Sequence, residues 1–372
     1  MATVTTPPSA GVVIVGAGLA GGLLALALRE RGEAVTVIDQ PEGDSTSATA
    51  ISYGALPGWP LTATPLGRLA AGAASRWRQL QRRHGELGWR PRRLRLHSSA
   101  SSSALAGLWP LPFSQVDTAV LSRRWPALLA AAGVERLVAQ VQALQGPEAG
   151  GPWRLQLRPA DGAPTWMAAE RVVLAAGAAC RSLWPALPSR LRSSWAAVLE
   201  LPTYPAALGP PRAWLPSRFT RVALEQRAAQ LQQPERALDA GLVPYGNGAL
   251  LGQLSWVGPG LELGPIPAAA EAEACLREQL GLDAWGAPLA PLPGRLRLAA
   301  VAFCLGGAPL VGPVPGAPPG LSVFSGFSAG FSQAPVLAPL LADLLAAHGS
   351  PERQAAACAR LQRLGVWPQP GG

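Results

Sequence analysis

Three glycines and one acid near the N-terminus have the types and spacing needed to hold a dinucleotide. Gly16, Gly18 and Gly21 form the pattern G-x-G-x-x-G. The first glycine permits a tight turn, the second lets the backbone approach a pyrophosphate, and the third lets a helix pack closely on a strand. Asp39 follows roughly 20 residues later, where a carboxylate accepts hydrogen bonds from ribose hydroxyls and repels a 2′-phosphate.

The elements around these residues are the ones that such a site requires. Residues 11–15 form a short β-branched run, which predicts a buried parallel strand. The next segment, from Leu19 to residue 31, has apolar residues at helical spacing and stops at a glycine. Residues 34–38 predict a second strand that ends at the acid. Phosphates would bind at the start of the helix, where free N–H groups and the dipole favour negative charge.

Length and composition predict a large globular protein. The chain has 372 residues, of which 49% are hydrophobic, enough for two connected domains. Its four cysteines are far apart and form no C-x-x-C pair, so we expect no metal site and no disulfide framework, as suits a reducing cytoplasm. The first ten residues lack the features of a signal peptide, and glycines interrupt the only long apolar run, so we expect no membrane span.

The positive charge is a weak indication of a nucleic-acid partner. All 31 basic residues are arginine, which points to a compositional bias and excludes every mechanism that requires a lysine. The densest basic stretch, residues 76–95, includes Trp77 and Trp89. It fits either a phosphate-binding patch or a solvated amphipathic helix and strand with aromatic core anchors, and we favour the second interpretation.

Further elements follow along the chain, and they divide the nucleotide domain into separate pieces. Residues 171–177 predict another strand that ends at the nucleotide. A hairpin is expected over 242–257 with its turn at Asn247-Gly248. The serine run 98–103 predicts a surface turn, and the segment 306–319 a loop rich in glycine and proline. Helices are expected over 64–85, up to residue 133, over 267–282 and over 333–348; strands over 137–144, 153–157, 166–169, 194–200, 295–303 and 320–325.

Taken together, these landmarks resemble the FAD-dependent amine and amino-acid oxidoreductases, the group that contains glycine oxidase, D-amino acid oxidase and sarcosine oxidase. The resemblance runs over nearly the whole chain and implies FAD as the cofactor. It implies an α/β fold in which a Rossmann-type FAD-binding domain of discontinuous segments carries an inserted α+β substrate domain with a mostly antiparallel sheet. The expected FAD-binding domain comprises residues 11–50, 115–185 and 305–350, the substrate domain 51–114 and 186–304, and a C-terminal extension 351–372.

The same resemblance implies a set of cofactor contacts. The hydroxyl-rich loop from Thr46 to Gly54 would wrap the FAD phosphates, and the pattern Val116, Asp117, Leu121 precedes the strand on the adenine side. Two closing glycines would bring backbone donors to the flavin ring. The expected cofactor-binding residues are Gly16, Gly18, Leu19, Gly21, Asp39, Thr49, Val138, Gly177, Gly326 and Gly330.

The sequence differs from these relatives at a residue that binds the substrate. Relatives that act on amino acids carry an arginine that grips the substrate carboxylate, and here that position is Val301. Either Arg295 or Arg297 on the same strand replaces it, or the substrate lacks the carboxylate. The substrate-binding candidates are Tyr53, Tyr245 and Arg297. For Cys304 a buried inert thiol is favoured over a covalent flavin link.

These features predict an FAD-dependent oxidase or dehydrogenase that acts on a C–N bond of a small amine or amino acid. The flavin carries the difficult step, so no catalytic acid or base has to be named. Two alternatives stay open: a flavin domain that acts on a modified wobble uridine of tRNA, and a degenerate FAD-binding protein, suggested by Val301 and Gly306. Neither the electron acceptor nor the oligomeric state follows from the sequence.

Overall fold

The computed structural model describes residues 9–40, 47–97, 111–148, 150–281 and 292–369. The expected start of the hydroxyl-rich loop at Thr46 and the serine run 98–103 lie outside the described residues.

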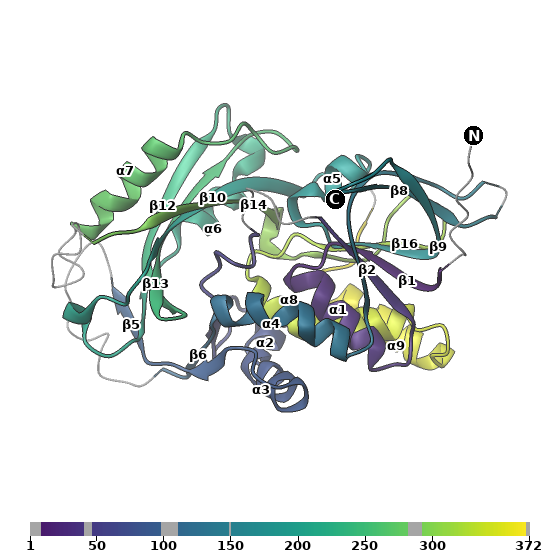
Figure 1. Cartoon of the computed structure of the whole chain (residues 1–372), viewed down its shortest axis with the longest axis horizontal. Helices are drawn as coiled ribbons and strands as arrows, with labels where there is room; N and C mark the ends of the chain where they lie inside the picture. The colour runs from purple at the N-terminus through teal and green to yellow at the C-terminus, as the bar shows by residue number, and fades with distance from the viewer. Residues whose placement is uncertain (1–8, 41–46, 98–110, 149, 282–291, 370–372) are drawn as a thin grey trace.

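A seven-stranded sheet forms one half of the molecule, with β1, β9 and β16 close to its centre (Figure 1). Its parallel strands follow the order β7-β2-β1-β9-β16, which places β1 in the middle, as in nucleotide-binding sheets. β8 pairs antiparallel with β7 and β9, and β15 pairs antiparallel with β16. The strands are β1 (Ser9–Val15), β2 (Val35–Asp39), β7 (Glu135–Gln145), β8 (Trp153–Pro159), β9 (Thr165–Leu174), β15 (Leu310–Pro313) and β16 (Leu321–Ser325).

Both faces of β1 are covered, which explains its uninterrupted apolar sequence. Val12 and Ile14 belong to the core that includes helices α1 (Leu19–Arg29) and α8 (Gly330–Leu345). Val13 and Val15 belong to a second core beneath the β7-β8-β9 ribbon. The predicted strand and the predicted helix after it are therefore confirmed.

Except for the short α5, which packs on the other face of the sheet, the remaining helices of the first half pack around α1 and α8 (Figure 1). The single helix predicted over 64–85 is broken at residues 71–72 into two. Helix α9 contributes Leu361 to the first core, so the segment expected as an extension packs against α8. The helices are α2 (Pro65–Ala70), α3 (Ala73–His84), α4 (Thr118–Ala131), α5 (Cys180–Leu183) and α9 (Pro351–Arg363).

Trp77 of α3 is a core anchor, as favoured from the sequence. It is fully buried and stacks on Phe331 with ring centroids 5.7 Å apart. Its indole N–H donates to the Phe331 carbonyl oxygen at 2.9 Å. Pro335 lies four residues after Phe331 in α8 and has no N–H to offer that carbonyl, so the indole replaces the missing helical donor.

The second half is a six-stranded sheet in the order β14-β10-β13-β12-β11-β5, antiparallel except for the β11–β5 pair. Helix α7 (Ala269–Leu280) covers one face, and residues 51–53 pack on the other. A small sheet of β3, β6 and β4 lies beside them. The strands are β3 (Ala55–Pro57), β4 (Trp89–Pro91), β5 (Leu94–His97), β6 (Phe113–Val116), β10 (Leu191–Leu201), β11 (Ala213–Pro216), β12 (Glu235–Tyr245), β13 (Gly248–Val257) and β14 (Arg295–Cys304), and a short helix, α6 (Thr220–Gln226), follows β11.

Two sequence-based expectations about strands need correction. The stretches 166–169 and 171–177, expected as two strands, form the single strand β9, which pairs with β8 at its start and with β1 at its end. The loop expected over 306–319 contains β15, which sits at the edge of its sheet, where proline and glycine are tolerated. The predicted hairpin is confirmed, but its turn is displaced by one residue: β12 and β13 pair from Tyr245 and Gly248 onward, so the two turn residues are Gly246 and Asn247 rather than Asn247 and Gly248.

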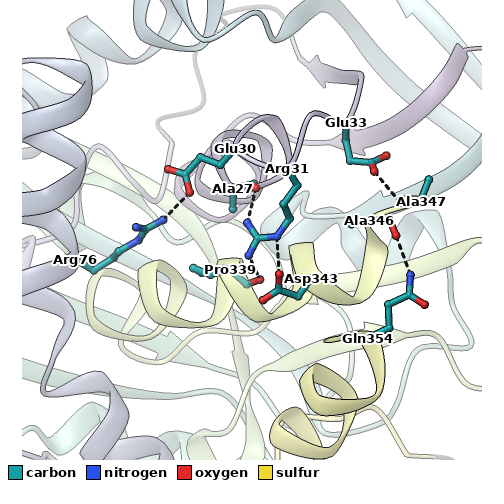
Figure 2. A network of polar contacts seen from close by, with 10 residues as sticks. All are labelled: Ala27, Glu30, Arg31, Glu33, Arg76, Pro339, Asp343, Ala346, Ala347 and Gln354. Carbon is teal, nitrogen blue, oxygen red and sulfur yellow. Dashed lines mark hydrogen bonds and ion pairs between the residues drawn. The ribbon is translucent and has the colours of Figure 1, made fainter. Parts of the chain in front are cut away.

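Polar contacts join the residues that follow α1 to α8 and to the residues after it (Figure 2). Arg31 donates to Asp343 Oδ1 at 2.8 Å and to the Pro339 carbonyl at 2.8 Å. Glu33 accepts from the backbone N–H of Ala347 at 2.7 Å and from Arg171 at 2.8 Å. Burial of Glu33 would raise its pKa, but its bonds to Arg171 and Ala347 outweigh that effect, and the pKa is lowered.

We expect Glu33→Gln to reduce the free energy of unfolding at pH 7 by about 1 to 3 kcal/mol, because a buried charged acceptor is lost. A lowered folded-state pKa stabilises the fold above the unfolded value of 4.5, and this contribution disappears as pH falls through the folded value. Urea titrations at pH 7 and well below pH 4.5 measure the effect, with exposed Glu170→Gln as the control. An equal difference at both pH values would contradict the charged role.

Candidate functional site

The expected cofactor residues gather at the carboxyl ends of the parallel strands. The glycine turn follows β1, Asp39 ends β2, and Gly177 follows β9. Val138 stands in register beside Asp39 on β7, and the segment 326–330 follows β16. Open α/β sheets bind ligands in the crevice at these ends. The geometry therefore brings the predicted positions to one edge of one sheet.

Each of the three glycines of the turn is required, or permitted, for a different structural reason. Gly16 has a φ of 103°, which a side chain rarely adopts, and a Cβ on Gly21 would lie 1.9 Å from the Gly16 carbonyl oxygen. A Cβ on Gly18 would meet only the Thr49 hydroxyl, at 3.5 Å, and the φ of Gly18 is an ordinary −61°. The fold thus requires Gly16 and Gly21, whereas Gly18 borders space that the protein leaves open, as a bound pyrophosphate needs.

Thr49 lies against the start of α1. Its hydroxyl oxygen accepts from the Leu19 N–H at 3.0 Å. The Thr118 hydroxyl lies 3.1 Å from the carbonyl oxygens of Ala50 and Ser52, and this contact fixes the loop that carries Thr49 to the start of α4. A hydroxyl-bearing loop is thereby fixed at a helix N-terminus, where an anion is favoured.

Asp39 lies at the end of β2 with its side chain 30% exposed. Its Oδ1 accepts from the Ala17 N–H at 3.3 Å, and its Oδ2 from Arg136 Nη2 at 3.1 Å. Val138 beside it is 49% exposed, which is unusual for a valine in a strand and suits an apolar ring laid against it. Sequence reasoning missed Arg136, because no local pattern links β7 to the acid of β2.

The expected cofactor site, called the cradle below, runs from the start of α1 to the ends of β9 and β16. The ends of β9 and β16 form its ring end, where the flavin ring is expected. The Ser325 hydroxyl lies 3.4 Å from the Gly177 carbonyl and joins the two ends. Gly177 has a φ of 58°, and a Cβ there would meet nothing within 4 Å. Gly326 has a φ of 83°, and its Cβ would lie 2.3 Å from Cys304 Sγ. Gly330 is the first residue of α8.

Cys304 is buried behind this end of the cradle. Burial raises the pKa of its thiol to about 12, so the thiol stays protonated at neutral pH and is a poor nucleophile. This agrees with the inert thiol favoured from the sequence.

The substrate-binding candidates lie in two places: Tyr53 beside Gly241 of β12, and Arg297 and Tyr245 near Glu200. Tyr53 is buried, and its hydroxyl donates to the Gly241 carbonyl at 3.2 Å. Burial, followed by the charge of Asp239, raises the pKa of Tyr53 well above 10, so the phenol is neutral. Arg297 donates to Glu200 at 2.7 Å, and the pKa of Tyr245 is raised first by burial and then by Glu200. Arg297 is seven residues from Cys304 on β14, which corresponds to about 23 Å of strand.

A charged cluster next to the segment 326–330 was not foreseen. Arg221 of α6 donates to the Ser328 carbonyl at 3.1 Å and forms an ion pair with Glu225. Asp239 accepts from the Thr220 hydroxyl at 2.7 Å and from the Arg221 N–H at 3.1 Å, and so caps α6. Helix α6 itself was not predicted, since seven residues give too short a periodic signal.

Within the described residues, no group of histidine, cysteine and acidic side chains is placed to hold a metal ion. Among the same residues, no helix combines the length and the apolarity needed to cross a membrane.

Comparisons with known proteins agree with this geometry. Residues 11–131 match the family profile described as FAD dependent oxidoreductase. No curated protein sequence matches the chain.

Solved structures share the fold at low sequence identity. Glycine oxidase from Geobacillus kaustophilus has a TM-score of 0.67 at 18% identity, over 91% of this chain and 95% of that chain. L-proline dehydrogenase from P. horikoshii has 0.68 at 15% identity, over 97% and 100%. L-amino acid deaminase from Proteus vulgaris has 0.63 at 15% identity, over 94% and 93%. At these identities the likeness establishes the fold.

Gly18→Ala should separate folding from cofactor retention. The added methyl group makes only an ordinary contact with Thr49, so we expect the melting temperature of the apoprotein to stay within about 2 °C of wild type. The same methyl group occupies the space for the pyrophosphate, so the FAD dissociation constant should rise at least about tenfold. Gly258→Ala, where the methyl group would meet nothing within 4 Å, is the control. Unchanged FAD affinity would refute the placement.

Asp39→Asn tests the ribose contact. We expect it to weaken FAD binding by about 1.5 to 3 kcal/mol, because a charged acceptor is replaced by a neutral one of the same shape. Isothermal titration of the apoprotein with FAD measures the change. Glu271→Gln removes another ion-paired carboxylate, on α7, and should leave FAD affinity unaltered. If the two variants bind FAD equally well, the assigned role of Asp39 is wrong.

Proposed function

Since residues 11–131 match the family described as FAD dependent oxidoreductase, we propose that this chain oxidises a C–N bond of a small amine or amino acid. The cofactor is FAD, and the chain is an oxidoreductase. The single observation that carries the finer proposal is the cradle, in which Gly18, Thr49, Asp39 and Val138 lie together at the strand ends, with free space at Gly18 and an exposed Val138. The similar folds named as glycine oxidase, L-proline dehydrogenase and L-amino acid deaminase support it.

The residues fit the cofactor along its length. The start of α1 and the Thr49 hydroxyl would bind the pyrophosphate, Asp39 the ribose, and the strand at Val138 the adenine. The ends of β9 and β16, with Gly177, Gly326 and Gly330, would hold the ring. Bound FAD supplies a two-electron acceptor: the C–H bond next to nitrogen is lost with its electron pair, an N–H proton leaves to solvent, and an imine remains.

The protein's own contribution is positioning and the exclusion of water. Tyr53 is neutral and donates to a backbone carbonyl, while the Asp239 carboxylate is engaged by the start of α6. Neither side chain is arranged as a general base. An amine that arrives unprotonated needs none, because orientation against the ring lowers the barrier.

We also propose the reducing, cytoplasmic setting expected from the sequence. All four cysteines are free thiols, and Cys180 and Cys304 are buried. A chain without disulfides suits such a compartment.

The test is the purified protein under anaerobic conditions. We expect it to contain FAD, and we expect its flavin absorbance to bleach when a small amine is added, without dithionite. Gly258→Ala should behave like wild type, and Gly18→Ala should retain less flavin. A protein whose flavin is bleached by dithionite but by no amine would disprove C–N oxidation and favour the degenerate flavoprotein.

A further inference from the structure

The side-chain cations of this protein are arginines and histidines. The chain has no lysine, and all 31 arginines lie within the described residues, whereas the side chain of His97 lies outside them. A substrate carboxylate held in a partly buried site needs a guanidinium or another cation that is not already neutralised. The charge of the substrate can therefore be inferred from which arginines reach the ring end of the cradle.

The sheet face beside Tyr53 is apolar around Val301 and charged farther along β14, where Arg297 stands opposite Val198 of the same face. Val301 packs, partly buried, on the cluster that includes Ile51 and Tyr53. The other buried residues of this cluster in the six-stranded sheet are Ala196, Val198, Ala213, Leu215, Val243, Leu250 and Ala299. A carboxylate laid on this face would be desolvated without a partner, which is costly.

Arg295 and Arg297, the two substitutes expected from the sequence, lie farther along the same face of β14, away from the ring end. Arg297 is four residues, about 13 Å of strand, from Val301 and about 23 Å of strand from Cys304, which lies beside the ring-side glycine Gly326. In a small amino acid the carboxylate is one bond from the carbon that must meet the ring. Arg297 is also bonded to Glu200 at 2.7 Å, and Arg295 is 71% exposed, so its charge is screened by solvent.

The guanidinium that does reach the ring end is neutralised. Arg221 donates to the Ser328 carbonyl, but its other terminal nitrogen is paired with Glu225, whose side chain is 3% exposed. Asp239, 1% exposed, adds a second carboxyl at the start of the same helix. Whether or not Glu225 carries a proton, this cluster has no net positive charge.

Two further arginines near Cys304 donate hydrogen bonds to backbone carbonyls. The terminal nitrogens of Arg181 donate to carbonyl oxygens of residues 185, 187, 188 and 191. Arg190 donates to the Ala308 and Pro309 carbonyls. These bonds hold turns of the chain, so neither guanidinium is arranged as a fork that faces the sheet surface at Val301.

We propose that the substrate is an amine without a carboxylate, carrying apolar substituents that pack on the face at Val301 and Tyr53. This inference rests on the proposed C–N oxidation and narrows its substrate class. The electron and proton balance is that of the amine oxidation above, with bound FAD as the oxidant, and it requires no carboxylate.

The experiment compares matched amines that differ only in that group, on the FAD-loaded protein without oxygen. The pairs are pyrrolidine with proline, benzylamine with phenylglycine, and dimethylamine with sarcosine. We expect the member without the carboxylate to bleach the flavin at least about tenfold faster per unit concentration. A carboxylated member that reacts equally fast or faster overturns the inference and leaves the proposed function standing.

A binding measurement keeps the inference testable without turnover. Benzylamine and benzoate are titrated separately while the perturbation of the flavin absorbance is recorded. We expect benzylamine to act at a concentration at least about tenfold lower; tighter binding of benzoate overturns the inference. If no amine of any pair bleaches the flavin, the proposed function fails, and the titration still decides the charge preference.

Val301→Arg places a cation on the apolar face, and Val301→Met is its uncharged control. We expect the arginine variant to shift the proline-to-pyrrolidine rate ratio at least about tenfold toward proline, and the methionine variant to leave the ratio unchanged. Flavin content reports whether each variant folds. An arginine variant that retains FAD and keeps the wild-type ratio would overturn the placement of the substrate beside Val301.

Discussion

The close approach of α1 to β1 is the constraint on which the rest of the site depends. A Cβ at Gly21 would lie 1.9 Å from the Gly16 carbonyl oxygen, so the helix can begin directly at the strand end only because that side chain is missing. This contact aims the first N–H groups of α1 at the edge of the sheet. The contacts on its far side hold it there: Arg31 joins the end of α1 to Asp343 and the Pro339 carbonyl of α8 (Figure 2).

The local part of this arrangement was predictable from sequence because its determinants are close in the chain. Turn, helix, strand and acid lie within residues 11–39, and spacing alone carries the information. The hairpin of β12 and β13 is predictable for the same reason, although its turn residues are Gly246 and Asn247, one position before the expected pair. The single strand β9 was not, because its two halves owe their conformation to different partners, β8 and β1.

Long-range contacts account for what the sequence could not predict. Arg136 reaches Asp39 across 97 positions, and Arg221 reaches Ser328 across 107. Neither arginine differs in local context from the many arginines that a compositional bias has placed on the surface. The sequence shows that Val301 stands where relatives have an arginine. What this implies for the substrate needed the fold, which shows that Arg297 lies farther along the strand and that Arg221 is paired with Glu225.

The six-stranded sheet is held by side chains of residues 53, 115 and 117, which bond to the backbone of β12 and of the turn after it. Tyr53 donates to the Gly241 carbonyl, and a Cβ at Gly241 would lie 2.9 Å from that hydroxyl, so β12 receives the phenol only as glycine. Gln115 donates to the carbonyls of Tyr53 and Pro244 at 3.1 and 2.8 Å, and Asp117 accepts from the Gly246 N–H at 3.0 Å. Buried bonds of this kind are costly to leave unmade. A change of substrate range in this fold is therefore expected through side chains on the sheet face, such as Val301, rather than through movement of the sheet.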